Sequence, residues 1–167
     1  MTSPEPRHAA WMGLALTEAR AALSTADVPI GAVVIGPDGT VLGSGRNERE
    51  ALGDPTAHAE MVAIREAAAR LQELSARGGS AGDGWRLADC TLVVTLEPCA
   101  MCAGAISHAR IGRVVFGAED PKGGAVVHGP QFFAQPTCHW RPEVTGGVMA
   151  QESADLLRGF FRERRKK

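Results

Sequence analysis

The sequence predicts an α/β fold with three layers, α-β-α, in which a mixed five-stranded sheet has helices on both faces. Three observations lead to this prediction. Segments with apolar residues at helical spacing alternate along the chain with short β-branched runs. In the second half, residues 91–96 and 111–116 are mostly apolar strands of the buried type, as in parallel strands that helices cover on both sides. In the first half, two strand-like runs are joined by a tight turn, as in an antiparallel hairpin.

The first segments predict a helix and then this hairpin. Residues 8–26 are rich in alanine and carry apolar residues at helical spacing, and Pro29 cannot lie inside a helix. Residues 30–35 and 40–45 predict the two strands. Between them, Pro37 presets φ and Gly39 supplies a positive φ, which is the chemistry of a turn.

Residues 58–74 predict a second helix. One side of this helix carries apolar residues at helical spacing, and we expect it to face the core: Met61, Ile64, Ala67, Ala68, Leu71 and Leu74. Asp54 or Thr56 is expected to cap its N-terminus. Residues 77–85 are rich in glycine and predict a loop.

The second half predicts two more helices and three strands. The strand 91–96 ends at Glu97, and Pro98 suits the first turn of a third helix that runs to about residue 109. Strand 111–116 follows, then a loop over 121–136 with one short helix, and a strand over 143–148. Residues 149–165 predict the last helix, whose Phe160 and Phe161 we expect in the core.

Length and composition restrict the class of protein. With 167 residues, 44% apolar and 22% charged, the chain is expected to form one domain spanning residues 1–167. It is too apolar for a disordered chain, and it has no apolar run long enough for a membrane helix. Four cysteines are too few for a disulfide scaffold, and no signal peptide is visible at the start, so we expect a cytoplasmic protein.

The charge is distributed unevenly. The net charge is −1, but residues 158–167 hold six basic residues and one acid, a net charge of +5, which leaves −6 on the other 157 residues. A basic helical end of this kind is typical of phosphate binding in nucleic-acid partners. The alternative is a solvated helix end whose cations complement the helix dipole.

Four residues combine into a pattern with metal chemistry. Cys99 and Cys102 are three residues apart at a helix N-terminus, so both can hold one ion on the same face. His58 would be a third zinc ligand, and a catalytic zinc site keeps its fourth position for water. Glu60, two residues after His58, can move the proton of that water without binding the metal.

Taken singly, these residues have other interpretations. A Cys-x-x-Cys pair also occurs in structural zinc sites and in redox proteins. A structural site needs a fourth protein ligand, for which the sequence offers Cys90, Cys138 and His139. A zinc-stabilised binding module without activity would not need Glu60, so the joint pattern favours an enzyme.

The complete pattern, H-x-E followed by P-C-x-x-C, is the signature of the zinc deaminases. The chain resembles the cytidine deaminase-like superfamily, and within it the bacterial tRNA-specific adenosine deaminases, over nearly its whole length. The segments that carry the resemblance are VPIGAVV (28–34), GRN (45–47), DPTAHAE (54–60), VTLEPCAMCAGAISHARIGRVVFGAEDPKGGA (94–125) and FFRERR (160–165).

The resemblance implies a cytidine deaminase-like fold and one zinc ion per subunit. It implies a homodimer that converts adenosine to inosine at the wobble position A34 of a tRNA anticodon loop, with Glu60 delivering protons. It also implies substrate-binding roles for five residues: Asn47, Ala59, Pro98, Asp120 and Lys122. From the residues alone, a turn is the alternative explanation for Asn47, and Asp120-Pro121 is also a turn signal.

A deaminase of a free base or nucleoside (guanine, cytosine or cytidine) uses the same metal site and remains the alternative. The basic C-terminal end and the Asp120-Pro121-Lys122 loop favour tRNA. The segment 132–144 is unusual and resembles the form found in some bacterial members, and it keeps the free-base alternative open. The segment 75–85 departs from the usual shorter linker, and Cys90 and Cys138 have no assigned role.

Overall fold

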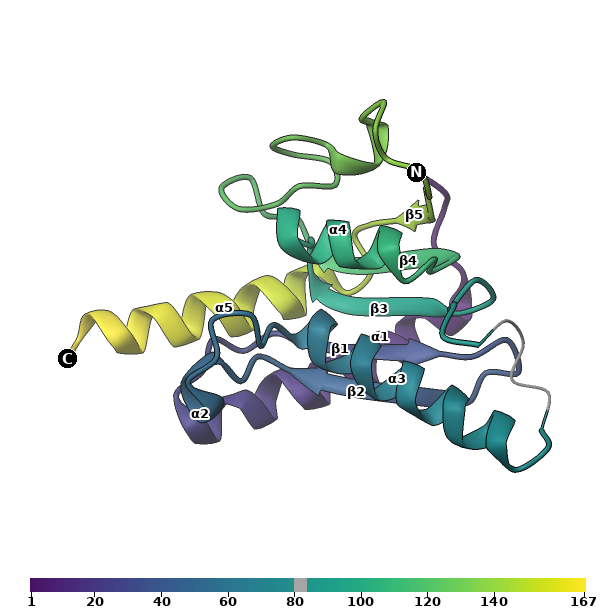
Figure 1. Ribbon diagram of the computed structural model, residues 1–167. Coiled ribbons are helices and arrows are strands. Elements are labelled where there is room, and N and C mark those ends of the chain that lie inside the picture. The colour runs from purple at the N-terminus through teal and green to yellow at the C-terminus, as the bar shows by residue number, and fades with distance from the viewer. Residues whose placement is uncertain (80–83) are drawn as a thin grey trace.

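The computed structural model describes residues 1–79 and 84–167, so part of the glycine-rich loop predicted over 77–85 lies outside the described residues (Figure 1). The elements are α1 (Pro6–Ala21), η1 (Ala22–Thr25), β1 (Gly31–Ile35), β2 (Val41–Arg46), α2 (Arg49–Leu52), α3 (Ala59–Ala76), β3 (Thr91–Leu96), α4 (Ala100–His108), β4 (Arg113–Ala118), η2 (Phe132–Ala134), β5 (Glu143–Thr145) and α5 (Ala150–Arg165). None of the described helices is long and apolar enough to cross a membrane.

The sheet is mixed and has five strands in the order β2-β1-β3-β4-β5. β1 is antiparallel to both β2 and β3, whereas β3, β4 and β5 run parallel. This confirms the predicted hairpin and the predicted parallel half. Because β3 and β4 are parallel, the segments that follow them emerge at the same edge of the sheet.

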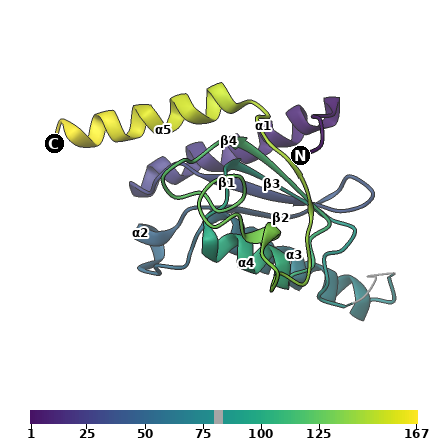
Figure 2. The ribbon, with the colours of Figure 1, turned by 90° about the horizontal axis from the view of Figure 1, so that it is seen from above.

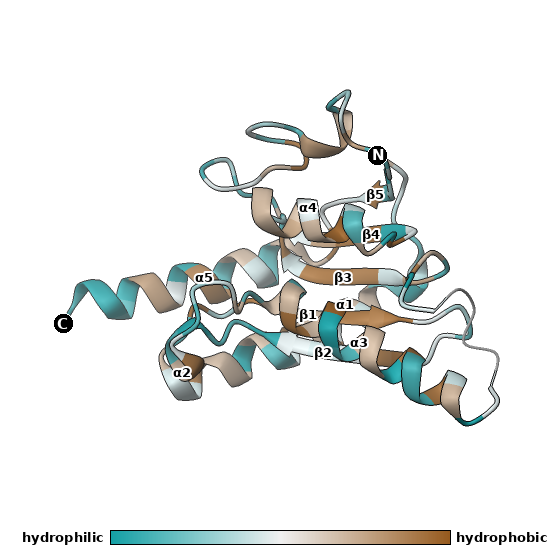
Figure 3. Cartoon of the chain, viewed as in Figure 1, coloured by the Kyte–Doolittle hydropathy of each residue, from teal (hydrophilic) through white to brown (hydrophobic). Residues whose placement is uncertain are grey.

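Helices cover both faces of the sheet, as predicted. α1 and α5 pack on one face and α3 on the other, with α4 beside it (Figures 1 and 2). Each face has its own apolar core: Met12, Leu16, Val33, Val93 and Val115 lie in one, and Ala63, Val94, Ile106 and Phe116 in the other. The strands β1 and β3 are correspondingly hydrophobic along their length (Figure 3).

The buried face of α3 matches the prediction in part. Ala67 is fully buried and Ile64 and Leu71 pack against the core, as predicted, but Leu74 is exposed. The fully buried centre of the face is formed by Ala59, Ala63 and Ala67. The reason lies in β2, where a side chain on Gly43 or Gly45 would overlap the backbone of α3. The helix therefore lies directly against the strand, backbone to backbone, and only alanine fits between them.

Several helix ends also differ from the predictions. α1 begins two residues earlier than predicted, with Pro6 in its first turn, and the Glu5 backbone N–H donates to His8 Nδ1. α4 begins at Ala100 with Cys99 as its N-cap, so Pro98 precedes the helix and the prediction that it occupies the first turn is wrong. The N-cap of α3 is His58, not Asp54 or Thr56. The short helix α2 was not predicted.

The far half of α5 leaves the body of the molecule. Its first turns pack on β4 and β3, with Leu156 against the core, while its polar C-terminal end projects beyond the sheet (Figures 1 and 3). Phe160 is half-buried and Phe161 is 43% exposed. The prediction that both rings lie in the core is therefore wrong.

Candidate active site

His58 reaches the site from the start of α3. A turn precedes it, in which Asp54 Oδ1 accepts hydrogen bonds from the backbone N–H and the hydroxyl of Thr56, both at 2.8 Å. These bonds lower the pKa of Asp54. The His58 backbone is extended, with φ −73° and ψ 153°, and its side chain caps nothing. The imidazole is therefore free to turn away from its own helix.

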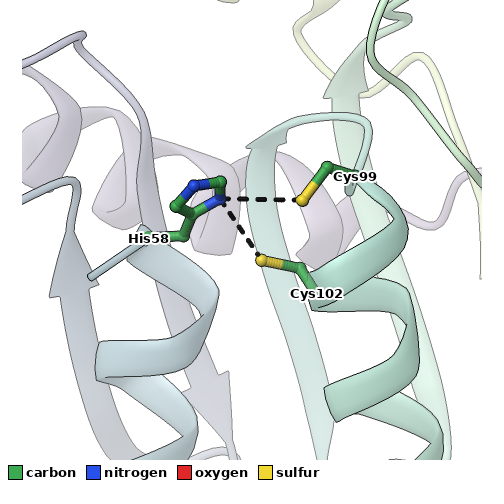
Figure 4. Close-up of side chains that lie close together, drawn as sticks. All are labelled: His58, Cys99 and Cys102. Carbon is green, nitrogen blue, oxygen red and sulfur yellow. Dashed lines mark hydrogen bonds between the residues drawn. The ribbon is translucent and has the colours of Figure 1, made fainter. Parts of the chain in front are cut away.

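Cys99 and Cys102 face His58 from the start of α4. Their Sγ atoms lie 3.7 Å and 3.5 Å from His58 Nδ1 (Figure 4). All three donor atoms lie within 4.8 Å of one another. Two helix N-termini that are 41 residues apart in sequence thus bring one nitrogen and two sulfur atoms together, as predicted.

The spacing of these donors fits zinc. A tetrahedral ion with Zn–N bonds of about 2.0–2.1 Å and Zn–S bonds of about 2.3 Å separates a nitrogen ligand from a sulfur ligand by about 3.6 Å. The observed distances of 3.7 and 3.5 Å agree with that value. Among the described residues, the cluster contains three donors and no fourth, which is the donor number of a catalytic zinc site with one open position.

The three candidate fourth protein ligands lie outside the donor cluster. The buried Cys138 donates its thiol to the Trp140 backbone carbonyl at 3.2 Å. Burial raises the pKa of the Cys90 thiol to about 11, so that this residue stays protonated at neutral pH. Neither of these cysteines, nor His139, belongs to the donor cluster. The structural-zinc alternative therefore lacks its fourth ligand within the described part of the chain.

The two thiols of the site differ in acidity. The hydrogen bond from Cys102 lowers the pKa of Cys99 to about 4, against the opposing effect of burial. The same interaction and burial raise the pKa of Cys102. Cys99 is consequently a thiolate at neutral pH, the form that ligates metals. Zinc binding would displace the remaining proton from Cys102.

Glu60 is buried in the first turn of α3, with 4% of its surface exposed. Burial raises its pKa to about 7. Its carboxyl group lines the same cavity as His58 and Cys99 but does not belong to the donor cluster. A carboxyl group with a pKa near neutrality, beside a metal site but outside it, suits proton transfer.

A cavity of about 910 Å³ opens over the site. Four of the five predicted substrate-binding residues line it: Asn47, Ala59, Asp120 and Lys122. The fifth, Pro98, is absent from the described lining, and its backbone carbonyl accepts a hydrogen bond from Ala125 at 2.9 Å. The interpretation of Asn47 as a turn residue also has support, because its Oδ1 accepts a hydrogen bond from the Arg49 N–H at 3.3 Å.

The C-terminal helix forms one wall of this cavity. Leu157 and Phe161 contribute apolar surface, and five basic residues stand around the space: Arg49, Lys122, Arg158, Arg164 and Arg165. Arg164 lies over the Phe160 ring, 5.4 Å from its centre. Three arginines of the basic end that the sequence singled out thus line the same cavity as the metal cluster, which no local pattern could have predicted.

Sequence reasoning missed one buried charge in this region. Glu97, which follows β3 directly, is only 2% exposed, and its Oε1 accepts a hydrogen bond from His128 Nδ1 at 2.8 Å. Burial would raise the pKa of Glu97, but the hydrogen bonds from His128 and from three backbone N–H groups outweigh it and lower the pKa. The only indication in the sequence that Glu97 is buried was its position between a buried strand and Pro98.

Comparison with known proteins agrees with this geometry. Residues 5–118 match the family model described as the cytidine and deoxycytidylate deaminase zinc-binding region. A tRNA-specific adenosine deaminase of Agrobacterium fabrum is 50% identical over 155 residues, which cover 93% of this chain and 94% of that relative. A relative from Deinococcus radiodurans named tRNA(Ile)-lysidine synthase is 49% identical over 163 residues; the match covers 98% of this chain but only 26% of that longer protein.

Two solved structures share the fold. One, from studies of A-to-I editing by tRNA:A34 deaminases, is 49% identical, with a TM-score of 0.76, and the match covers 89% of this chain and 99% of that one. The other, a guanine deaminase from Nitrosomonas europaea, is 26% identical with a TM-score of 0.66, over 93% and 84% of the two chains. The chain therefore belongs to the cytidine and deoxycytidylate deaminase zinc-binding family, in the branch that contains the bacterial tRNA-specific adenosine deaminases.

Proposed function

We propose that this protein catalyses the hydrolytic deamination of adenosine to inosine in tRNA, at the wobble position A34. The observation that carries the proposal is the placement of Glu60 beside the donor cluster of His58, Cys99 and Cys102 at one cavity. The 50% identity to a tRNA-specific adenosine deaminase supports it independently.

In the proposed reaction, water adds to C6 of adenosine and ammonia leaves, which gives inosine. Zinc held by His58, Cys99 and Cys102 would lower the pKa of water toward about 7 and so supply a nucleophile at neutral pH. Glu60 takes up one proton from this water and delivers it to N1 of the ring, and then carries the proton of the new C6 hydroxyl to the departing amine, which leaves as ammonia. Its buried position keeps the proton relay away from bulk solvent.

An RNA substrate is consistent with the cavity and its rim. About 910 Å³ is near the upper end of the range for small-molecule pockets, roughly 300–1,000 Å³. The arginines of α5 and Lys122 offer charge-assisted contacts to phosphates on either side of a target nucleotide. We propose that Asp120, which lines the cavity, accepts a hydrogen bond from a ribose 2′-hydroxyl, which would favour RNA over DNA.

The proposed function has a direct test in Glu60→Gln. The variant should keep one zinc ion per chain and lose about 10²–10⁴-fold in deamination of an anticodon stem-loop that carries A34. Glu73→Gln is the matched control, because Glu73 lies exposed near the other end of α3. A Glu60→Gln variant that deaminates at the wild-type rate would remove the assigned role.

The remaining parts of the proposal concern assembly and location. We propose that residues 1–167 act as one deaminase domain, that the active species is a homodimer, and that the protein works in the cytoplasm, where tRNA is modified. Sedimentation equilibrium of the zinc-loaded protein tests the dimer. A monomer at the concentrations that support full activity would contradict it.

A further inference from the structure

Glu97 holds together a segment that has no helix or strand of its own. The segment covers residues 119–128 and is called the pocket segment below. Five of its donors converge on the Glu97 carboxylate. Oε1 accepts from the backbone N–H of Asp120 at 3.1 Å and from His128 Nδ1 at 2.8 Å. Oε2 accepts from three backbone N–H groups, those of Val126, Val127 and His128, at 3.2, 3.1 and 3.1 Å.

The Glu97 carboxylate therefore supplies hydrogen-bond acceptors to the backbone N–H groups of the pocket segment, as a neighbouring strand does in a sheet. Buried backbone N–H groups need acceptors, and here one buried side chain supplies them for both ends of a ten-residue segment. The Glu97 side chain has no exposed surface, so water does not compete for these bonds. A buried carboxylate is tolerated because it accepts so many hydrogen bonds.

Gly124 shows how closely the segment is packed onto this carboxylate. A Cβ built on Gly124 would lie 2.3 Å from Glu97 Oε2 and 2.5 Å from the Asp120 carbonyl oxygen. No side chain fits there unless the segment moves away from Glu97. The adjacent Ala125 N–H donates to the Pro98 carbonyl at 2.9 Å, which ties the segment to the turn that carries Cys99.

The same segment forms part of the wall of the candidate active site. Glu119, Asp120, Lys122 and Gly123 line the cavity that also contains His58 and Glu60. The side chain of Asp120 is held in place by its own segment, since its Oδ1 accepts hydrogen bonds from the N–H groups of Lys122 and Gly123 at 3.1 and 3.0 Å. Glu97 thus stands between the metal-binding turn on one side and four cavity-lining residues on the other.

We propose that Glu97 is a positioning residue, which fixes the pocket segment against the Cys99 turn and so determines where the nucleotides flanking the target base are held. The identity of the ligand rests on the proposed function. The geometric part, that Glu97 sets the place of Asp120 and Lys122 relative to the metal site, does not depend on it.

Glu97→Gln tests the proposal with little change in volume. It replaces one of the two acceptor oxygens by an NH₂ group, so at least two N–H groups of the pocket segment lose their acceptor. Glu143→Gln is the matched control, because Glu143 is exposed, pairs with Arg113, and lies where β4 and β5 begin, whereas the site lies where β3 ends. Both variants are compared with the zinc-loaded wild type.

Three readouts separate positioning from general damage. Zinc content should stay at one ion per chain. The amide of Asp120, or those of Val126, Val127 and His128 if the new NH₂ group takes the place of Oε2, should exchange hydrogen at least about tenfold faster, while those of α4 and β4 keep their rates. For the anticodon stem-loop, KM should rise about tenfold with kcat within about threefold, because uniform binding of flanking nucleotides is lost. Simple destabilisation would lower kcat with KM unchanged.

Gly124→Ala provides a second approach to the same contact, in case Glu97→Gln folds poorly. It should accelerate the same amides and raise the same KM, with zinc retained. Wild-type exchange rates at these amides in both variants, or an unchanged KM despite faster exchange, would overturn the proposal. A wild-type enzyme that leaves RNA untouched would refute the proposed function instead, and the amide exchange would still decide the role of Glu97.

Discussion

The contact between β2 and α3 yields the sharpest quantitative prediction, because it sets the position of His58. A Cβ on Gly45 would lie 2.3 Å from the Ala59 carbonyl oxygen and 2.7 Å from the Ala63 nitrogen. Ordinary contact begins at about 3.4 Å, so Gly45→Ala must push the first turn of α3 away by about 1 Å. Gly43 and Gly45, both in β2, do not have a positive φ. The destabilisation expected from an alanine at either position is therefore due to packing alone.

We expect Gly45→Ala to cost about 1–3 kcal/mol of unfolding free energy, which lowers Tm by roughly 2–4 °C per kcal/mol in a chain of this size. Because His58 directly precedes the displaced turn, zinc affinity should also fall, by about 10–100-fold. Thermal unfolding and competition with a chromophoric chelator measure the two effects.

Two further glycines serve as controls for this prediction. Gly43→Ala is equally crowded, with Ala63 O at 2.4 Å, but lies one turn farther from His58, so it should lower Tm with a smaller loss of zinc affinity. Gly13→Ala, in α1 with nothing within 4 Å, should raise stability by about 0.5–1 kcal/mol. The reasoning is refuted if Gly45→Ala binds zinc as tightly as the wild type.

The remaining predictions concern the metal and pH. Cys99→Ala should lose zinc while Cys138→Ala, away from the cluster, keeps it; elemental analysis showing full zinc in Cys99→Ala would remove that residue from the site. Asp27 is buried, which would raise its pKa, but hydrogen bonds from Thr25 and from the backbone N–H groups of Glu50 and Ala51 outweigh burial and lower the pKa. Its contribution to stability is therefore full above the unfolded-state pKa and is lost as pH falls through the lower folded-state pKa. Urea unfolding between pH 7 and pH 3 should show a weaker pH dependence for Asp27→Asn, and an unchanged dependence would contradict this assignment.

Sequence patterns predicted the layers and the donor residues because both depend on local spacing. Apolar runs identified β3 and β4, and the three-residue spacing of Cys99 and Cys102 placed both on one face of α4. The buried face of α3 was predicted in part, since Ala67, Ile64 and Leu71 do face the core, but Ala59 and Ala63 at its centre were missed because the close contact with Gly43 and Gly45 of β2 leaves room only for alanine. The close packing of β2 against α3 depends on the residues of both elements, so the pattern of one element alone does not predict it.

The same limit explains what was missed at the site. The N–H groups that donate to Glu97 are 23 to 31 residues away in sequence, so no local pattern reveals why that carboxylate is buried. Phe161 is exposed because the C-terminal part of α5 extends past the end of the sheet. How far it extends depends on the position of the strands that α5 packs against, which the sequence of the helix does not reveal. The basic end was visible from composition, but its place beside Glu60 required the fold.

The choice of substrate is the central claim, and one competition experiment tests it most directly. The zinc-loaded protein is offered an anticodon stem-loop carrying A34 together with free adenosine, cytidine, guanine and cytosine. Inosine in the RNA and ammonia release are then measured. The proposed function predicts inosine at position 34 of the RNA and no deamination of the free compounds. Ammonia from a free base or nucleoside, with A34 unchanged, would contradict it.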